Sequence, residues 1–278
     1  MKKQLIEIAG AVKKQKTIEG IKAIIPKAQG ANKMTQELTQ AETRTRAVRR
    51  DKGQLITTPR DLVLLTWINE QQAISIDHLQ ILIARHTENK EELNNPKMAS
   101  QPVASKLITR WLKLNYIETA KINNRQWVWV SAKGIKNLDL DYGYYEPSLY
   151  NHIHEVNKVR LFWESKKIEW TPERFIRKTQ GKGHRLSQHF PDGEILYRGN
   201  KIAIEVELSV KRGADKKKIS EKYAIALMKM QHGKSKGLFG YHYEGLIYYT
   251  NEKTHETILK LYEGIEGAEV RKLSDITL

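Results

Sequence analysis

The sequence predicts a mixed α/β (α+β) protein with two folded domains behind a basic N-terminal arm. Residues 1–50 carry twelve Lys or Arg against four Glu and no aromatic residue, so half of the net charge of +16 lies there. Apolar residues recur at helical spacing in 58–138, and a strictly alternating strand at 201–211 marks a second domain. We therefore expect an arm at 1–57, domains at 58–138 and 147–278, and a connector at 139–146.

The composition limits the classes of protein and of partner. A charge of +16 in 278 residues favours a polyanionic partner, nucleic acid first and an acidic membrane second, although a solvated lysine-rich surface is the alternative. The absence of cysteine excludes disulfides and cysteine-based zinc sites. Glu7 interrupts the apolar part of a signal-like start, and the longest apolar run, 62–68, is too short to cross a bilayer. We expect a cytoplasmic protein without a membrane partner.

The arm is interrupted by Gly20, Pro26 and Gly30, and we expect it to be mobile, with a transient helix at 33–49. Such a basic segment would follow the phosphate backbone of DNA without reading its sequence. A tail without a role is the alternative.

The first domain is predicted to contain three helices and a β-hairpin. Helices are expected at 59–69, 76–86 and 102–114, with Ser75 and Asp77 as possible N-caps of the second helix and a polar loop at 87–100. Strands are expected at 116–122 and 126–131, because Asn123-Asn124 between them tolerates positive φ. This order is typical of a winged helix-turn-helix. Winged helices also bind proteins, but the charge favours DNA.

One face of the third helix is polar and basic, which makes it the candidate recognition surface for a DNA major groove. The residues of that face are Ser105, Lys106, Thr109, Arg110 and Lys113. Lys121 and Arg125 flank the tip of the hairpin, where a wing would meet phosphates.

The second domain is predicted to alternate helices and strands. Helices are expected at 147–165, 214–230 and 252–263, and strands at 168–170, 194–197, 201–211, 244–250 and 268–273. The segment 176–190 is basic and is expected to be a loop. A hairpin is expected to turn at Gly199-Asn200.

The strand at 201–211 carries the candidate chemistry. Its alternation puts aliphatic residues on one face and Glu205 and Glu207 on the other, ~6.5–7 Å apart, which predicts a half-buried strand. Acids this close favour a hard divalent cation, Mg²⁺ or Mn²⁺. The hairpin would bring Asp192 near them, completing a three-carboxylate site. Lys211 shares their face but needs a bulge or the strand twist to reach the site. An ordinary turn at 191–193 and a soluble strand edge are the alternatives.

The proline-aspartate followed by Glu-x-Glu resembles the PD-(D/E)xK, or restriction-endonuclease-like, nuclease superfamily, with Glu207 where that family usually has lysine. Some restriction endonucleases also have glutamate there, and the general-base role stays open. A second resemblance spans 58–250 and is to the MobC-class relaxases of mobilisable plasmids, which are similar to the replication-relaxation family. The matching residues are His152, Asn157 and Arg160; His189, Pro191, Asp192 and Gly193; and Glu205, Glu207 and Lys211.

The resemblance implies a metal-dependent single-strand nick at a plasmid transfer origin, in duplex DNA that becomes single-stranded at the nick, with other mobilisation proteins as further partners. Asp192, Glu205 and Glu207 would hold the metal, and His189 or Lys211 would orient water or stabilise developing charge. His152, Asn157 and Arg160 would reach the phosphate. The alternatives are a double-strand endonuclease of restriction or transposition type and a non-catalytic DNA-binding regulator of replication or transfer.

Overall fold

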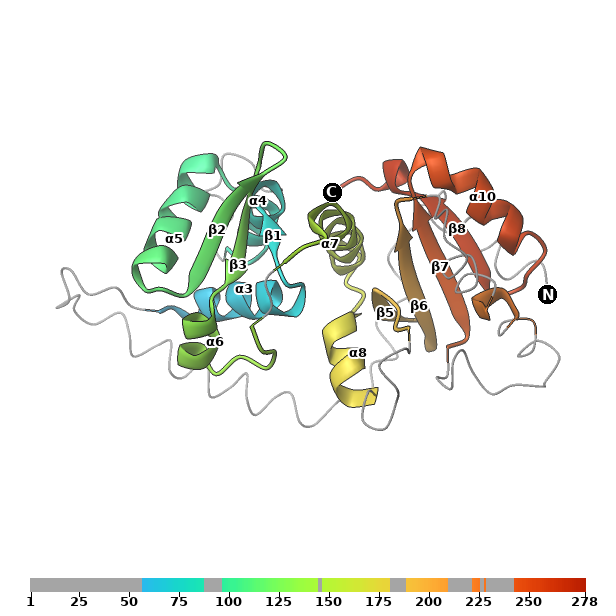
Figure 1. Cartoon of the computed structure of the whole chain (residues 1–278), viewed down its shortest axis with the longest axis horizontal. Coiled ribbons are helices and arrows are strands. Elements are labelled where there is room, and N and C mark those ends of the chain that lie inside the picture. Colours follow the sequence, from blue (N-terminus) through green and yellow to red (C-terminus); the bar gives the residue numbers. More distant parts are fainter. Residues whose placement is uncertain are drawn as a thin grey trace, which may run out of the picture. The chain divides into compact units, whose positions relative to one another are not determined.

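The structure is a computed structural model that describes residues 57–87, 97–144, 147–180, 189–209, 222–225, 228 and 243–278 (Figure 1). The chain divides into two units after Ile56. The first unit lies outside the described residues, and with it the expected arm and its helix at 33–49. The described part combines α-helices with two β-sheets, as the sequence predicts. No helix within it has both the length and the apolar character needed to cross a membrane.

The segment from Thr57 to residue 144 forms helices around a three-stranded antiparallel sheet of order β1-β3-β2. Its elements are α3 (Pro59–Glu70), β1 (Ile74–Ser75), α4 (Ile76–Arg85), α5 (Gln101–Lys113), β2 (Ile117–Ile122), β3 (Arg125–Val130) and α6 (Ala132–Leu138). The bounds of α3, α4 and α5 confirm the predicted helices to within one residue. The turn between β2 and β3 is also confirmed, because Asn123 and Asn124 have φ of 52° and 61°.

Two local features of this segment differ from the prediction or add to it. The side chain of Ser75 stands at the N-cap position of α4 but makes no capping bond there; its hydroxyl lies 3.1 Å from Nδ1 of His154 instead. Helix α6 was not predicted. It begins after Ser131, whose Oγ accepts a hydrogen bond from the Gly134 N–H at 2.9 Å and so caps the helix.

The second half contains a five-stranded sheet of order β4-β5-β6-β7-β8. Its elements are α7 (Tyr150–Ser165), β4 (Trp170–Pro172), α8 (Glu173–Gln180), β5 (Gly193–Tyr197), β6 (Asn200–Glu207), β7 (Gly245–Thr250), α10 (Glu252–Tyr262), β8 (Ala268–Lys272) and the 3-10 turn η2 (Leu273–Asp275). Strands β4, β5 and β6 are antiparallel, whereas β6, β7 and β8 run parallel. Residues 222–225 and 228 are helical, within the helix predicted at 214–230.

Three predictions for this half are corrected. The first part of the expected loop at 176–190 is helical, because α8 covers 173–180 and buries Ile176; the glycines that suggested a loop come only after it. The hairpin turns one residue earlier than expected, at Arg198 and Gly199, which have φ of 53° and 82°. Strand β6 ends at Glu207, so the expected continuation to 211 stops short within the described residues.

The prediction of a half-buried strand at β6 is also wrong, because both of its faces are covered. Ile204 and Val206 pack in a cluster with Val159 of α7. Ala203, on the opposite face, packs with Tyr223 and with residues of β7 and α10. A parallel crossover from β6 to β7 places helical chain over the second face, which an alternating pattern alone does not predict.

Helix α7 connects the two sheets. It contacts β1 and α4 on one side and β4 and β6 on the other, and Figure 1 shows it between them. Its apolar residues Val156, Val159 and Trp163 belong to the core of the five-stranded sheet. Side chains of α7 can therefore contact residues of both sheets.

Candidate functional site

The β5–β6 hairpin places Asp192 beside Glu205. The register pairs Gly193 with Ile204, so continuing it by one residue sets Asp192 opposite Glu205. The backbone N–H of Val206 donates a hydrogen bond of 2.7 Å to Oδ2 of Asp192 and holds the carboxylate against β6. The structure thus brings together two of the three predicted carboxylates.

His152 of α7 contacts the other oxygen of Asp192. Its Nε2 lies 2.8 Å from Oδ1 of Asp192. The negative charge of Asp192 raises the pKa of His152 to about 9, against the opposing effect of burial. Burial alone would raise the pKa of Asp192, but His152 and the Val206 N–H outweigh it, and the pKa is lowered. The pair is therefore an imidazolium and a carboxylate at neutral pH.

Glu205 has a matching pair of partners. Its Oε1 lies 2.8 Å from Nε2 of His189 and accepts a hydrogen bond of 2.8 Å from the hydroxyl of Tyr223. Burial raises the pKa of Glu205, and the charge of Asp192 adds to that rise. Burial opposes protonation of His189, but Glu205 outweighs it and raises the pKa of that histidine. Two carboxylates and two histidines thus form one electrostatically coupled group, which we call the paired-acid site.

Glu207 and Lys211 are not placed in this group. Oε1 of Glu207 accepts a hydrogen bond of 3.2 Å from the Ser209 N–H, just beyond the end of β6. Lys211 lies outside the described residues. Within the described ranges, one group of three potential metal ligands has its ligand atoms within 4.8 Å of one another, and it is formed by Asp77, His78 and His154 rather than by the three predicted acids.

Asn157 and Arg160 use their side chains to hold α7 against the first half of the chain. Nδ2 of Asn157 donates a hydrogen bond of 2.8 Å to the carbonyl oxygen of Ala73. Arg160 pairs with Glu70 of α3 at 2.7 Å, and with Glu164 of its own helix at 2.7 Å. These contacts give both residues a structural task that the sequence-based expectation of phosphate contact did not include.

A small cavity adjoins the Asp192 side of the paired-acid site. It has a volume of about 30 Å³ and is lined in part by His152, Asp192 and Glu173. Glu173 was not predicted as a neighbour of this site, because it stands at the start of α8, where no helix was expected. Tyr223 was not predicted either, since a tyrosine whose hydroxyl contacts Glu205 has the same sequence pattern as an ordinary core tyrosine.

Most residues of the predicted recognition face of α5 are exposed, but one of them pairs with a buried acid of the protein. Ser105, Lys106, Thr109 and Lys113 are exposed. Arg110 instead forms a salt bridge with the buried Asp61. In the hairpin, Lys121 is exposed, and Nε of Arg125 lies 3.9 Å from a carboxylate oxygen of Asp77.

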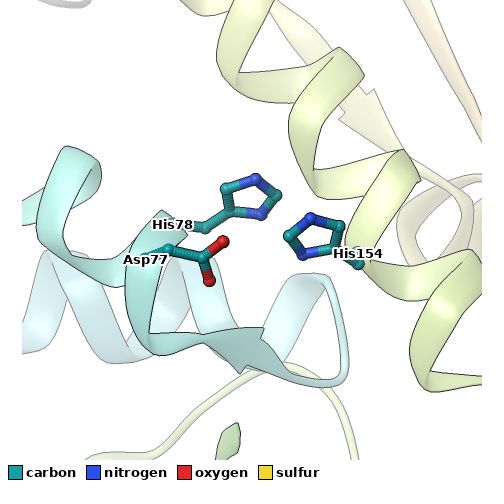
Figure 2. A group of neighbouring side chains, drawn as sticks. All are labelled: Asp77, His78 and His154. Atoms are coloured by element: carbon teal, nitrogen blue, oxygen red, sulfur yellow. The ribbon is translucent and has the colours of Figure 1, made fainter. Parts of the chain in front are cut away.

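A second polar cluster lies where α4 meets α7. Figure 2 shows Asp77 and His78 of α4 beside His154 of α7. The two imidazole rings are stacked, with centroids 4.1 Å apart. Burial lowers the pKa of His78 to about 3 and that of His154 to about 4, so both rings are neutral at physiological pH. Sequence spacing could not reveal this cluster, because His154 is remote in the chain from the other two residues.

Comparisons of the chain with protein-family models, with curated proteins and with solved structures find no match. The two clusters therefore have to be interpreted from their own chemistry.

Proposed function

We propose that this chain binds DNA and makes a metal-dependent, site-specific single-strand nick at a plasmid transfer origin. The observation that carries the proposal is the opposition of Asp192 and Glu205 across β5 and β6, with a histidine 2.8 Å from each carboxylate. Paired acids that hold a metal, with adjacent proton donors and acceptors, are one arrangement that can hydrolyse a phosphodiester.

The electrostatics of the paired-acid site fit a divalent cation. Two acids close together in a buried place repel each other unless positive charge lies nearby. His152 supplies such charge when protonated, and an ion could supply it in its place. The adjoining cavity of about 30 Å³ is lined by Asp192 and not by Glu205, and it has room for one water molecule on the Asp192 side. Asp192 and Glu205 would hold Mg²⁺ or Mn²⁺, because both ions prefer oxygen ligands.

The metal, when bound, would neutralise the scissile phosphate and activate the attacking oxygen. The chain's own residues would then position the reacting groups. Tyr223 orients Glu205 through its hydroxyl, and the Val206 N–H orients Asp192. His189 and His152, once released from the carboxylates, are the groups able to move a proton or to contact the phosphate.

The proposed fold is a winged helix-turn-helix followed by a restriction-endonuclease-like core. The order of three helices and a hairpin in 57–138 supports the first, and an acidic β5–β6 hairpin within a mixed sheet supports the second. In this arrangement α5 would enter the major groove with Lys106 and Lys113, and the tip of the hairpin would bring Lys121 to the backbone.

A second candidate is a non-catalytic DNA-binding regulator that keeps the same fold. The observation favouring it is that both carboxylates already have hydrogen-bond partners within the protein. Hydrogen bonds of this kind can stabilise the fold without taking part in catalysis. A double-strand endonuclease is a third reading, which differs from nicking only in its product.

The test is incubation of the full chain with Mg²⁺ or Mn²⁺ and supercoiled plasmid DNA into which the DNA flanking the chain's own gene has been cloned. We expect an open-circular product that Asp192→Ala and Glu205→Gln abolish while DNA binding persists. Glu269→Gln is the matched control, because this acid of β8 pairs with Arg271 outside the site and should leave nicking intact. A linear product would indicate double-strand cleavage. No cleavage, or equal cleavage by the site variants, would leave the regulator as the better account.

A further inference from the structure

The contact between α4 and α7 contains three potential metal ligands from two elements. Asp77 and His78 are adjacent on α4, and His154 comes from α7 (Figure 2). One ligand atom from each lies within 4.8 Å of the other two. Both histidines are buried, with exposed fractions of 4% and 9%.

Two polar atoms of this cluster are buried without a hydrogen-bond partner among the described residues: Nδ1 of His78 and Oδ1 of Asp77. Buried polar atoms in folded proteins are nearly always paired, so an unpaired nitrogen and an unpaired carboxylate oxygen on two adjacent residues call for an explanation. A bound cation would satisfy both atoms at once.

We propose that Asp77, His78 and His154 form a binding site for a first-row divalent transition-metal ion, with Zn²⁺ as the best fit. Imidazole nitrogen and carboxylate oxygen are ordinary zinc ligands, whereas Mg²⁺ prefers an all-oxygen environment. The inference is independent of the proposed nicking activity, since it concerns a different cluster on different residues.

The surroundings of the cluster support binding in some respects and oppose it in others. The hydroxyl of Ser75, 3.1 Å from Nδ1 of His154, orients that ring as oxygen partners of metal-binding histidines do. Glu155, the next residue, is half-buried, and burial raises its pKa against the opposing charges of Lys158 and Arg125. The positive charges that face the cluster, Arg125 and Lys158, oppose a cation. The two carboxylates of Asp77 and Glu155 equal these two positive charges in number.

A pocket reaches the cluster from the α7 side and offers a route for the ion. It has a volume of about 470 Å³ and is lined in part by His154, Glu155 and Asn151. Two ligands of a tetrahedral zinc ion lie about 3.4 Å apart, given bonds of ~2.0–2.1 Å. The three side chains must therefore close in by rotating, which unstacks the rings of His78 and His154. Water from the pocket, or Glu155, can complete the coordination.

A metal at this place would fasten α4 to α7. Because α7 also packs on the five-stranded sheet, the ion would fix the helical first half against the second half. Its binding energy would add to the stability of the folded chain.

The experiment uses the full-length chain, stripped with a chelator and then titrated with Zn²⁺ by calorimetry. The paired-acid site would also attract Zn²⁺, so the reference is the Glu205→Gln chain. In it we expect one tight Zn²⁺ equivalent and a rise in melting temperature of about 5–10 °C when free Zn²⁺ is ~100-fold above its dissociation constant. When Co²⁺ replaces Zn²⁺, we expect the visible absorption bands of a tetrahedral site.

The variants locate the site. Asp77→Ala and His154→Gln should each lose this equivalent and its thermal shift, and Asp77→Ala is the more tolerant change because 41% of its side chain is exposed. His86→Gln, at the end of the same helix, and Glu205→Gln, in the paired-acid site, should retain both. Absence of tight Zn²⁺ binding to the folded wild-type chain would overturn the proposal. So would binding that Asp77→Ala leaves unchanged.

Discussion

His152 and Asp192 form an ion pair that joins α7 to the residue just before β5, with 2.8 Å between Nε2 and Oδ1. The pair links a helix that also contacts α4 and β1 to the hairpin bearing the second acid, Glu205. Its strength depends on the protonation of His152, whose pKa Asp192 raises to about 9. The stability of the fold should therefore depend on pH.

The direction of that dependence follows from the raised pKa. Unfolded His152 has an ordinary pKa near ~6.5, so the pair contributes its full stabilisation below that pH and loses it as the pH rises through about 9. We expect the free energy of unfolding to fall by about 1–2 kcal/mol across this range, after allowing for solvent screening of a partly exposed pair. Urea unfolding at several pH values measures it. His152→Gln should reduce the dependence, leaving the part due to His189, whose pKa Glu205 also raises, and His86→Gln should not reduce it. A wild-type stability that stays level from pH 6.5 to 9 is the contrary result.

Tyr223→Phe should destabilise the fold without changing its shape. The substitution removes the hydroxyl that donates to Oε1 of buried Glu205 at 2.8 Å and leaves that oxygen with His189 as its remaining partner. We expect a loss of about 1–3 kcal/mol in the free energy of unfolding at pH 7, measured by urea unfolding. Tyr197→Phe, on a half-exposed tyrosine near the hairpin turn, is the control. Equal midpoints for the wild type and Tyr223→Phe would show that this hydrogen bond contributes nothing.

Lys106→Ala and Arg110→Ala should have different effects, the first on DNA binding and the second on stability, although both residues lie on α5. Lys106 is exposed, so its loss should weaken DNA binding and lower the salt slope by about 1 while stability stays unchanged. Arg110 pairs with Asp61, which is 1% exposed, so its loss should cost about 1–3 kcal/mol of stability. Fluorescence anisotropy at several salt concentrations, together with urea unfolding, separates the two effects. Unaltered DNA binding by Lys106→Ala would remove this face of α5 from the DNA contact.

Deletion of residues 1–50 should make DNA binding less dependent on salt. The segment carries a net charge of +8, and each phosphate it neutralises releases counterions when DNA binds. A shallower plot of log affinity against log salt concentration is expected, with sequence preference retained. An unchanged slope would mean that the segment does not contact DNA.

The sequence predicted best those elements that local patterns determine. Apolar spacing located α3, α4 and α5, and the Asn123-Asn124 turn located the β2–β3 hairpin. The alternation in β6, with a turn before it, was enough to predict Asp192 near Glu205, although the turn came one residue early.

What the sequence did not predict depends on contacts between distant segments. The burial of both faces of β6 requires the crossover to β7. The resemblance named His152 and His189 as site residues but not their contacts with Asp192 and Glu205, and Tyr223 was not predicted. The cluster at Asp77 depends on the packing of α4 against α7. Helix α8 was missed because basic residues and nearby glycines also occur in loops, and the burial of Ile176 is a tertiary feature.

The central claim is that Asp192 and Glu205 share one divalent ion, and it is tested most directly by crystals of the chain soaked in Mn²⁺ and measured for anomalous scattering. We predict a peak between the two carboxylates, within about 2.0–2.6 Å of an oxygen from each, with the 2.8 Å contact of His152 to Asp192 broken. A map at saturating Mn²⁺ with no peak there, and with both histidines still on their carboxylates, would contradict it.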